Sequence, residues 1–510
     1  MTKVFILDFG SQYTQLIARK VRELGVYSEI FPCDASLRAL QKENPAALIL
    51  SGGPRSVYEE GAPLSDPGLF RLGIPVLGIC YGLQLMAHLL GGRVVPAAKR
   101  EYGFARLKIL DRSGLFKGIR DGSQVWMSHG DRVEKLPPGF VLTARTANTQ
   151  VAAIESPGHG FFGVQFHPEV IHTREGKKIL GNYLFNLAKL KPEWSMKSFI
   201  SRKVAEVRQL VGSERVLCGL SGGVDSLVTA LVVQRAVGGR LTCVFVDNGL
   251  LRESHFEEWL ERLRRRFSLR VVGVNAAELF FARLRGVVSP ERKRKIIGQT
   301  FIEIFEREAR KIGGVKFLAQ GTIYPDVIES RPVKGPSATI KSHHNVGGLP
   351  RSLRFQLIEP LKELFKDEVR SLAAELGMAR EFIAQHPFPG PGLAVRVLGE
   401  VTPARAQLVR EADRILLEEV RKAGLYHRLW QAFAVLLPVR SVGVMGDQRT
   451  YEQVVAIRLV ESLDGMTANW FAARPEFLAR VSTRIVNEVE GVNRVVYDIT
   501  TKPPATIEWE

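Results

Sequence analysis

The sequence predicts an α/β protein in which two doubly wound parallel-sheet domains are followed by a small α+β domain. Short apolar runs alternate with helical patterns over the first 385 residues, which is typical of parallel sheets covered by helices. Residues 191–196 interrupt this pattern, and so do the proline- and glycine-rich residues 386–394. We therefore expect domains at residues 1–190, 195–385 and 386–510.

The composition is that of a globular protein with enough length for several cores: 510 residues, of which 45% are hydrophobic and 24% charged. No apolar run approaches the roughly 20 residues that span a bilayer, and residues 1–8 resemble a first strand rather than a signal peptide. We expect a cytoplasmic enzyme without a membrane partner. The four cysteines lack Cys-x-x-Cys spacing, which argues against a zinc site and a disulfide framework.

The net charge of +18 indicates an anionic partner. Residues 262–270 and 291–295 are locally basic, but neither run contains the interleaved aromatic residues of a single-strand nucleic-acid platform. Anionic small molecules such as nucleotides would also favour a positive field. We expect small-molecule substrates and no nucleic-acid partner, with most of these charges on solvated helix faces.

The first domain contains a candidate nucleophile. Residues 4–8, 46–50 and 74–79 are predicted strands, and the third leads into a Gly-x-Cys-x-Gly pattern centred on Cys80. Glycines on both sides permit the sharp strand-to-helix turn of a nucleophile elbow, and a thiol at a helix N-terminus loses its proton more readily. We therefore predict Cys80 as the nucleophile. The alternative, that Cys80 is a small buried apolar residue, leaves the two glycines unexplained.

A base and its orienting group follow the predicted strand that begins at residue 161. His167 and Glu169 are two residues apart in extended chain, so their side chains point to the same side, and Pro168 stiffens the backbone between them. We predict His167 as the general base and Glu169 as the residue that orients it.

These motifs resemble the triad (class I) glutamine amidotransferases. The resemblance implies hydrolysis of glutamine through a thioester on Cys80, with release of ammonia. It also implies an oxyanion hole formed by the N–H groups of Gly53 and Tyr81, and a glutamine-binding role for Gln84. Residues 127–131 resemble the family's substrate-side loop, although a plain polar turn has the same pattern.

The second domain begins with a glycine loop between a predicted strand, residues 215–220, and a predicted helix, residues 227–233. Backbone N–H groups at such a turn can bind phosphates, and the alternative is a plain glycine turn. The loop lacks the Lys-Ser/Thr ending of the usual nucleotide P-loop. It resembles the pyrophosphate loop of the ATP pyrophosphatase family, which cleaves ATP between its α and β phosphates. The predicted ATP-binding residues of this loop are Ser221, Gly222, Gly223, Val224, Asp225 and Ser226.

Four further ATP contacts are implied by the same resemblance. Val246 and Asp247, in the predicted strand of residues 241–249, would lie against adenosine, and Gly321 follows another predicted strand. Lys366 would reach the phosphates, although a lysine on a helix surface has the same local pattern. ATP implies magnesium, for which Asp225 is the predicted ligand.

A long loop rich in proline and glycine follows Gly321, at residues 331–350. Loops of this length often act as lids over reactive intermediates. It contains His343, His344 and Asn345, for which we prefer contact with the substrate. Paired histidines could also bind a metal, but no partner ligand has a recognised spacing.

The third domain combines predicted helices with predicted strands. The helical patterns cover residues 404–423 and 475–489, and strand patterns cover residues 441–445, 454–459 and 494–499. An exposed sheet of this kind can pair with a second subunit, so we expect a homodimer that forms through this domain.

Over its whole length the chain resembles the family of glutamine-hydrolysing GMP synthases. That resemblance implies glutamine, ATP and xanthosine monophosphate (XMP) as substrates. The residues it assigns to XMP outside the loop are Arg294, Asp447, Lys502, Ile507 and Glu508. Two alternatives stay open: another ATP pyrophosphatase, acting on a carboxylate or a transfer RNA, and a sensing protein with a degenerate active site.

Overall fold

The computed structural model describes residues 2–252, 256–330, 355–445, 447–462, 465 and 467–510. The chain forms two compact units that divide between residues 198 and 199, within helix α5 (Met196–Val211). Each unit has a sheet and an apolar core of its own. Among the described helices, none combines the length and apolar character that crossing a membrane requires. The predicted domain boundary at residues 385–386, inside the second unit, stays a prediction.

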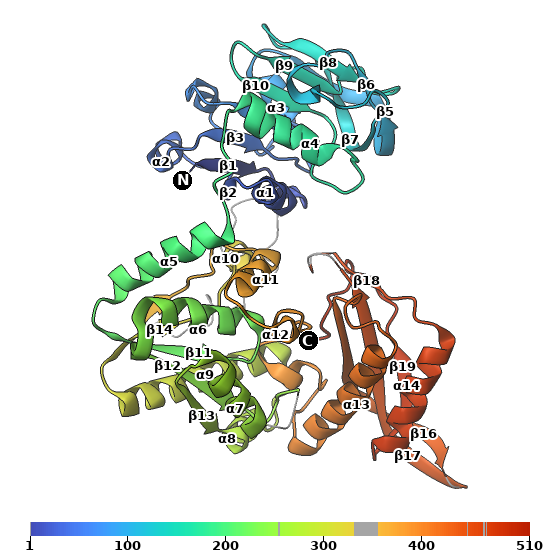
Figure 1. Ribbon diagram of the computed structural model, residues 1–510. Helices are drawn as coiled ribbons and strands as arrows, with labels where there is room; N and C mark the ends of the chain where they lie inside the picture. Colours follow the sequence, from blue (N-terminus) through green and yellow to red (C-terminus); the bar gives the residue numbers. More distant parts are fainter. Residues whose placement is uncertain (1, 253–255, 331–354, 446, 463–464, 466) are drawn as a thin grey trace. The chain divides into compact units, whose positions relative to one another are not determined.

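The first unit contains an eight-stranded sheet in the order β2-β1-β3-β4-β10-β9-β8-β6 (Figure 1). The strands from β2 to β10 are parallel, and the last three run antiparallel to their neighbours. The predicted strands at residues 4–8, 46–50 and 74–79 are thereby confirmed. The strands are β1 (Lys3–Asp8), β2 (Tyr27–Pro32), β3 (Ala47–Leu50), β4 (Val76–Ile79), β6 (Lys108–Ile109), β8 (Val141–Arg145), β9 (Ala153–Ser156) and β10 (Phe161–Val164).

A separate two-stranded ribbon pairs β5 (Arg93–Arg106) with β7 (Gln124–Lys135) in antiparallel fashion. Residues 127–131 lie inside β7, so the prediction that they form a loop is wrong. Pairing with β5 supplies backbone partners that a polar local sequence does not reveal. The helices of this unit are α1 (Thr14–Glu23), α2 (Leu37–Glu43), α3 (Tyr81–Leu89), α4 (Gly176–Gly181), the 3-10 helices η1 (Pro67–Arg71) and η2 (Gly114–Phe116), and the π-helix η3 (Asn182–Leu187).

The second unit begins with a fully parallel five-stranded sheet in the order β13-β12-β11-β14-β15. The chain leaves β11 toward β12 on one side and returns to β14 on the other, so the end of β11 is a topological switch point, where α/β sheets bind ligands. The strands are β11 (Arg215–Leu220), β12 (Leu241–Asp247), β13 (Val271–Asn275), β14 (Val315–Ala319) and β15 (Gln356–Ile358). The helices are α6 (Val224–Val237), η4 (Gly238–Arg240), α7 (Phe256–Phe267), α8 (Ala277–Leu284), α9 (Pro290–Ile312), α10 (Tyr324–Ser330), α11 (Lys366–Glu375) and α12 (Arg380–Ile383).

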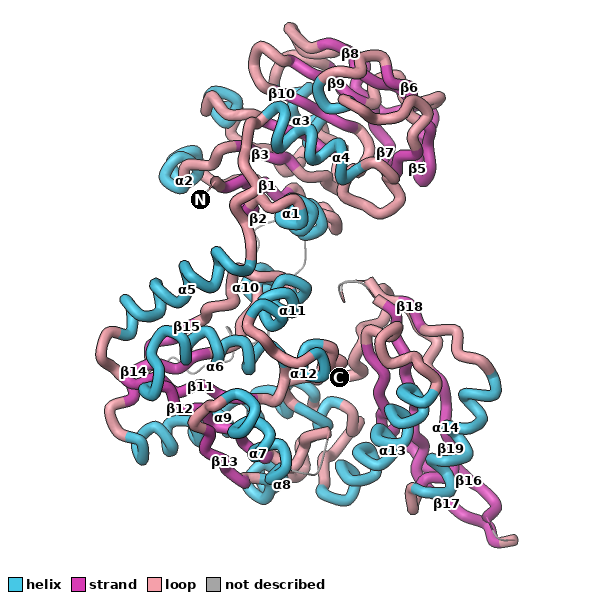
Figure 2. The backbone as a smooth tube through the Cα atoms, viewed as in Figure 1, coloured by secondary structure: helices cyan, strands magenta, loops and turns pink. Residues whose placement is uncertain are grey.

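The carboxyl-terminal part of this unit is α+β, as the sequence predicts (Figure 2). Strand β17 pairs antiparallel with β16 and β18 and parallel with β19. One hydrophobic cluster includes Leu217 of β11 and extends to Val492 of β19, so the parallel sheet and this part share a continuous core. The elements are η5 (Gly392–Val395), α13 (Pro403–Lys422), β16 (Gln431–Met445), β17 (Gln448–Glu461), β18 (Asn469–Trp470), α14 (Pro475–Glu488) and β19 (Val492–Tyr497).

Candidate active site

Cys80 stands at the turn between β4 and α3 with a φ of 53°, in the left-handed region that residues with a side chain rarely adopt. The close contact of strand and helix explains the glycines around it. A β carbon on Gly78 would lie 2.6 Å from the Gly82 carbonyl, and one on Gly82 would lie 2.3 Å from the Leu50 carbonyl oxygen. The Gly-x-Cys-x-Gly pattern therefore forms the strained elbow that the sequence predicts.

His167 and Glu169 lie beside this elbow. His167 Nδ1 donates to Glu169 Oε1 at 2.7 Å, which leaves Nε2 as the ring nitrogen available for proton exchange with Cys80. All three side chains are buried, and the backbone of His167 is held by Trp126 and Thr173. The structure thus brings together the three residues that were predicted as a triad from separate parts of the chain.

The electrostatics of His167 favour its protonated form. Burial of the ring would lower the pKa of His167, but the charge of Glu169 and the hydrogen bonds with Cys80 and Glu169 outweigh burial, so its pKa lies well above the usual value. A protonated ring beside the sulfur can stabilise a thiolate and later give its proton to a leaving amine.

The two residues predicted to supply the oxyanion hole, Gly53 and Tyr81, lie close to each other at the elbow. Tyr81 is the first residue of α3, where N–H groups have no partner inside the helix. A β carbon on Gly53 would lie 3.1 Å from the Tyr81 ring, and one on Gly52 would lie 3.2 Å from His167 Cε1. The segment after β3 therefore passes close to both the predicted base and the helix N-terminus.

Gln84 is buried one helical turn after the elbow. Its Nε2 donates to the Asp131 carbonyl and to Gln165 Oε1, each at 3.2 Å. Gln165 in turn places its Nε2 3.6 Å from Cys80 Sγ, and the sulfur also lies 3.6 Å from the Ser128 carbonyl. Gln84, which was predicted to bind the glutamine substrate, thus donates hydrogen bonds to groups of the protein. Gln165, to which the sequence assigned no role, contacts the predicted nucleophile.

The predicted phosphate loop follows β11 and opens α6 at the switch point of the parallel sheet. Gly222 has a φ of +78°, and Ser226 Oγ accepts from the Ser221 N–H at 3.2 Å and donates to the Gly223 carbonyl at 3.0 Å. These bonds shape a compact turn at a helix N-terminus, which is a suitable site for an anion.

Lys366 and Asp225 meet at this loop. Lys366 Nζ donates to both oxygens of the Asp225 carboxylate, at 2.7 and 2.6 Å. Gly321 is adjacent, because a β carbon there would lie 3.0 Å from the Asp225 backbone. The structure therefore brings three predicted ATP residues together from three segments of the chain.

Among the described residues, no three His, Cys, Asp or Glu side chains are grouped to hold a metal ion. The single carboxylate of Asp225 fits a magnesium ion that takes most of its ligands from phosphates and water. Because that carboxylate also bonds Lys366, the ion and the lysine would share it.

The residues predicted to contact adenosine end the neighbouring strand β12. Val246 is buried, while the Asp247 carboxylate is partly exposed and accepts from the Gly249 N–H at 2.8 Å. Arg410 of α13 binds the Gly249 carbonyl at 2.6 Å. Burial lowers the pKa of Arg410, and the charge of Asp247 opposes this shift. A helix from the α+β part therefore supports the turn after β12.

Two of the residues predicted to bind XMP, Arg294 of α9 and Glu508, are held by contacts that involve the last three residues of the chain. Arg294 donates to the Glu510 backbone oxygen, and its neighbour Lys293 is ion-paired with the Glu510 side chain. Glu508 accepts from Arg396, which is fully buried, at 3.0 and 3.2 Å, and from Gln431 at 2.6 Å. The carboxylate of Glu508 is therefore held by the protein itself.

The other predicted XMP residues are spread over the α+β part. Lys502 Nζ donates to the Gly465 carbonyl at 2.8 Å, and Ile507 packs against a small apolar cluster around Phe433. Asp447 is exposed at the turn between β16 and β17, with a φ of 62°. In Figure 1 the closed end of that hairpin lies far from the chain end marked C. His343, His344 and Asn345 lie outside the described residues.

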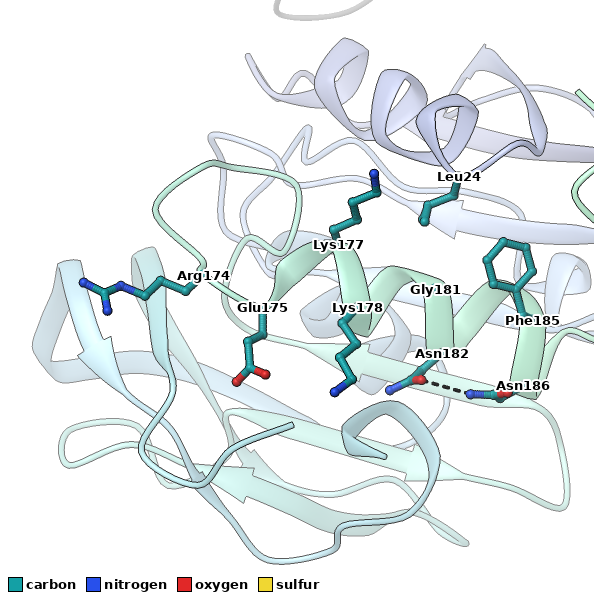
Figure 3. Close-up of a pocket in the computed structure, with 9 residues that line it drawn as sticks. All are labelled: Leu24, Arg174, Glu175, Lys177, Lys178, Gly181, Asn182, Phe185 and Asn186. Atoms are coloured by element: carbon teal, nitrogen blue, oxygen red, sulfur yellow. Dashed lines mark hydrogen bonds between the residues drawn. The ribbon is translucent and has the colours of Figure 1, made fainter. Parts of the chain in front are cut away.

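The first unit also has a hollow of about 500 Å³. Figure 3 shows its lining, which consists of Leu24, Arg174, Glu175 and residues of α4 and η3. None of the predicted site residues lines it. Two of its polar side chains already bind protein carbonyls, since Lys178 donates to Gly118 and Asn182 donates to Leu115. The hollow is therefore not part of the candidate site.

An elbow cysteine with a His–Glu pair, on an α/β sheet, defines the first unit as a class-I glutamine amidotransferase. The family model described as "Glutamine amidotransferase class-I" matches residues 5–187. A second family model, described as "GMP synthase C terminal domain", matches residues 418–509.

Curated relatives match the whole chain. A GMP synthase [glutamine-hydrolyzing] of Carboxydothermus hydrogenoformans is 56% identical over 509 residues, with 100% of both chains covered. One of Chlorobium limicola is 57% identical over 519 residues, again with 100% of both chains covered. Among solved structures, a glutamine amidotransferase from Thermotoga maritima is 20% identical and covers 37% of this chain and 98% of its own, with a TM-score of 0.30. The chain belongs to the family of glutamine-hydrolysing GMP synthases.

Proposed function

We propose that this chain makes GMP from XMP, with glutamine as the source of ammonia and ATP as cosubstrate. The observation that carries this proposal is the buried elbow cysteine, Cys80, beside a histidine whose Nδ1 is hydrogen-bonded to Glu169. Full-length similarity to relatives named GMP synthase [glutamine-hydrolyzing] supports the choice of substrates.

In the first half-reaction the Cys80 thiolate attacks the side-chain amide carbon of glutamine. The oxyanion that forms is stabilised by the N–H groups of Gly53 and Tyr81, a contribution of roughly 3 kcal/mol per donor in acyl-transfer enzymes. Protonated His167 gives its proton to the nitrogen as the C–N bond breaks, so ammonia leaves and a thioester remains on Cys80. His167 then removes a proton from water, which attacks the thioester and releases glutamate. Glu169 keeps the ring oriented throughout.

In the second half-reaction the loop at residues 221–226 binds the phosphates of ATP at the N-terminus of α6. The XMP base oxygen attacks the α phosphorus, pyrophosphate leaves and adenylyl-XMP forms. Ammonia then displaces AMP and yields GMP. Lys366 offsets charge on the phosphates, and magnesium, held by Asp225 together with the phosphates, would neutralise the departing pyrophosphate.

This proposal assigns glutamine hydrolysis to residues 1–190, ATP cleavage to residues 195–385, and dimer formation and XMP contacts to residues 386–510. The XMP residues Arg294, Lys502, Ile507 and Glu508 lie in the second unit together with the phosphate loop. We further propose a homodimer in the cytoplasm, which suits an enzyme of nucleotide synthesis.

One assay tests the reaction against its alternatives. The protein is incubated with glutamine, magnesium-ATP and XMP, and GMP, AMP and pyrophosphate are measured. We expect the three products in equal amounts. Pyrophosphate without GMP would indicate an ATP pyrophosphatase with another acceptor, and absence of AMP would rule out adenylylation.

Cys80→Ala separates the two half-reactions. Glutamine-driven synthesis should disappear, while synthesis from added ammonium should persist, because the adenylylating loop does not use the thiol. Loss of both activities in a folded variant would contradict this assignment.

A further inference from the structure

We propose that Gln165 is a further catalytic residue of the thiol site: its side-chain amide donates a hydrogen bond to Cys80 Sγ and stabilises the thiolate, and Gln84 sets the orientation of that amide. The inference deepens the proposed function, because it rests on Cys80 as the nucleophile.

Gln165 is placed beside the sulfur by its own backbone and by close packing. Its N–H donates to the Ala152 carbonyl at 2.8 Å, and its side chain is completely buried. The strand before it lies close to α3, because a β carbon on Gly163 would lie 2.6 Å from Leu83 Cδ1. The amide nitrogen therefore lies 3.6 Å from Cys80 Sγ, a hydrogen-bonding distance for sulfur.

The acceptors around Gln84 decide which end of the Gln165 amide faces the sulfur. The Asp131 carbonyl can only accept, so the Gln84 atom 3.2 Å from it is the NH₂ group. The same group lies 3.2 Å from Gln165, which must therefore present its oxygen there. The NH₂ group of Gln165 consequently faces Cys80.

A second set of contacts holds the Asp131 carbonyl in place. His129 Nδ1 lies 2.8 Å from that carbonyl and must donate to it. On its other side, His129 contacts Thr149, and both Thr149 and Thr146 bind the buried Glu101 carboxylate. The orientation of Gln84 is thus supported by a buried network behind the site.

The donor acts on the charged form of the sulfur. Hydrogen bonds to an ionised partner are stronger than those between neutral groups, so the amide favours thiolate over thiol. The Ser128 carbonyl, 3.6 Å away, can accept only from the S–H form. The same donor also stabilises the thiolate as it leaves the thioester, so both chemical steps gain from it.

The test follows alkylation of Cys80 by iodoacetamide as a function of pH, with the Cys80 peptide quantified by mass spectrometry. Gln165→Met keeps the length of the side chain and removes the donor. We expect the midpoint of its pH–rate profile to rise by about one pH unit. At low pH this variant should therefore be alkylated about tenfold more slowly than the unsubstituted protein, and at high pH the two rates should become equal. Burial and the charges of Asp34 and Asp8 raise the pKa of Cys33 to about 11, so that thiol reacts little over the same range.

The titratable groups around the sulfur are unchanged in these variants, so a shift in the midpoint of the pH–rate profile measures the effect of the Gln165 amide. They are His167 and Glu169 after β10, His129 and Asp131 on β7, and Glu101 on β5. Gln84→Met should shift the midpoint in the same direction by a smaller amount. Gln150→Met, at an exposed glutamine of the same unit, is the matched control and should leave the midpoint unchanged.

Steady-state rates supply the second measurement. In Gln165→Met we expect kcat for glutamine hydrolysis to fall about tenfold at neutral pH, with KM within about twofold and ammonium-driven synthesis unchanged. If this variant does not fold, Gln165→Glu replaces it, and the carboxylate should raise the midpoint further.

An unchanged midpoint in a folded Gln165→Met protein would overturn the inference. A Gln84→Met variant with a raised KM and an unchanged midpoint would overturn the orienting role and favour direct glutamine binding by Gln84. Alkylation needs no substrate, so these outcomes are distinct from failure of the proposed function, which would appear as glutamine hydrolysis by Cys80→Ala.

Discussion

Lys366 and Asp225 are separated by 141 residues, yet Lys366 donates to both oxygens of the Asp225 carboxylate. The contact connects the first residue of α11 to the first turn of α6, where the candidate phosphate loop ends. A cation is thus held at the loop before any nucleotide binds.

Lys366→Met should therefore weaken ATP binding. We expect KM for ATP to rise about tenfold or more, because one charge-assisted hydrogen bond is lost. The rate of glutamine hydrolysis, measured without ATP, should not change. Lys362→Met is the matched control, because Lys362 is exposed four residues earlier. Equal KM values in the two variants would show that Lys366 is an ordinary surface lysine.

Gly82→Ala should disrupt the elbow. The new β carbon would lie 2.3 Å from the Leu50 carbonyl oxygen, so β3 or α3 must move, and we expect a loss of about 3 kcal/mol in unfolding free energy together with loss of glutamine hydrolysis. Urea unfolding followed by hydrogen exchange of peptides from β3 and α3 measures this. Gly158→Ala has no atom within 4 Å of the added carbon and should be neutral. Equal stabilities would contradict the packing explanation.

The His167–Glu169 pair should make the stability of the first unit depend on pH. The pKa of His167 is raised on folding, so the pair's contribution is fully present below the unfolded pKa of about 6.5 and is lost as pH rises through the folded pKa. The gap in unfolding free energy between the native protein and Glu169→Gln should therefore be largest near pH 6 and shrink toward pH 9.

Urea titrations at four pH values from 6 to 9 measure that gap. Glu23→Gln, which removes a surface ion pair with Lys20, is the control and should give a difference that stays constant over this range. A gap that widened as pH rose would have the wrong sign for a raised histidine pKa.

Glu508→Ala should destabilise the second unit in addition to any effect on XMP. It leaves the buried Arg396 without its closest carboxylate, and breaking a buried pair in this way costs about 3 kcal/mol. Urea unfolding of the protein, followed by hydrogen exchange of peptides from β16 and β17, measures this loss of unfolding free energy. The control is Glu490→Ala, at an exposed glutamate. A higher KM for XMP with unchanged stability would show that Glu508 serves only the substrate.

The parts of the candidate site whose local geometry could be predicted from the sequence are those built within a few residues of each other. Gly78, Cys80 and Gly82 define their own turn, and His167 and Glu169 share one side of an extended segment, so backbone geometry alone relates them. Alternating apolar runs likewise predict parallel strands in both units. Residues 127–131 were misjudged because their pairing partner, β5, lies at a distance in the sequence.

Sequence by itself determined the α/β class and was enough to predict a nucleophile, a histidine partner and a phosphate loop, because each depends on local patterns of size, charge and backbone freedom. Only the tertiary structure decided that Gln165 contacts Cys80, that Lys366 binds Asp225 and that Glu508 is held by Arg396. The physical reason is that a buried donor takes the acceptor that neighbouring strands and helices place within reach, and the order of those elements is set by packing of the whole core.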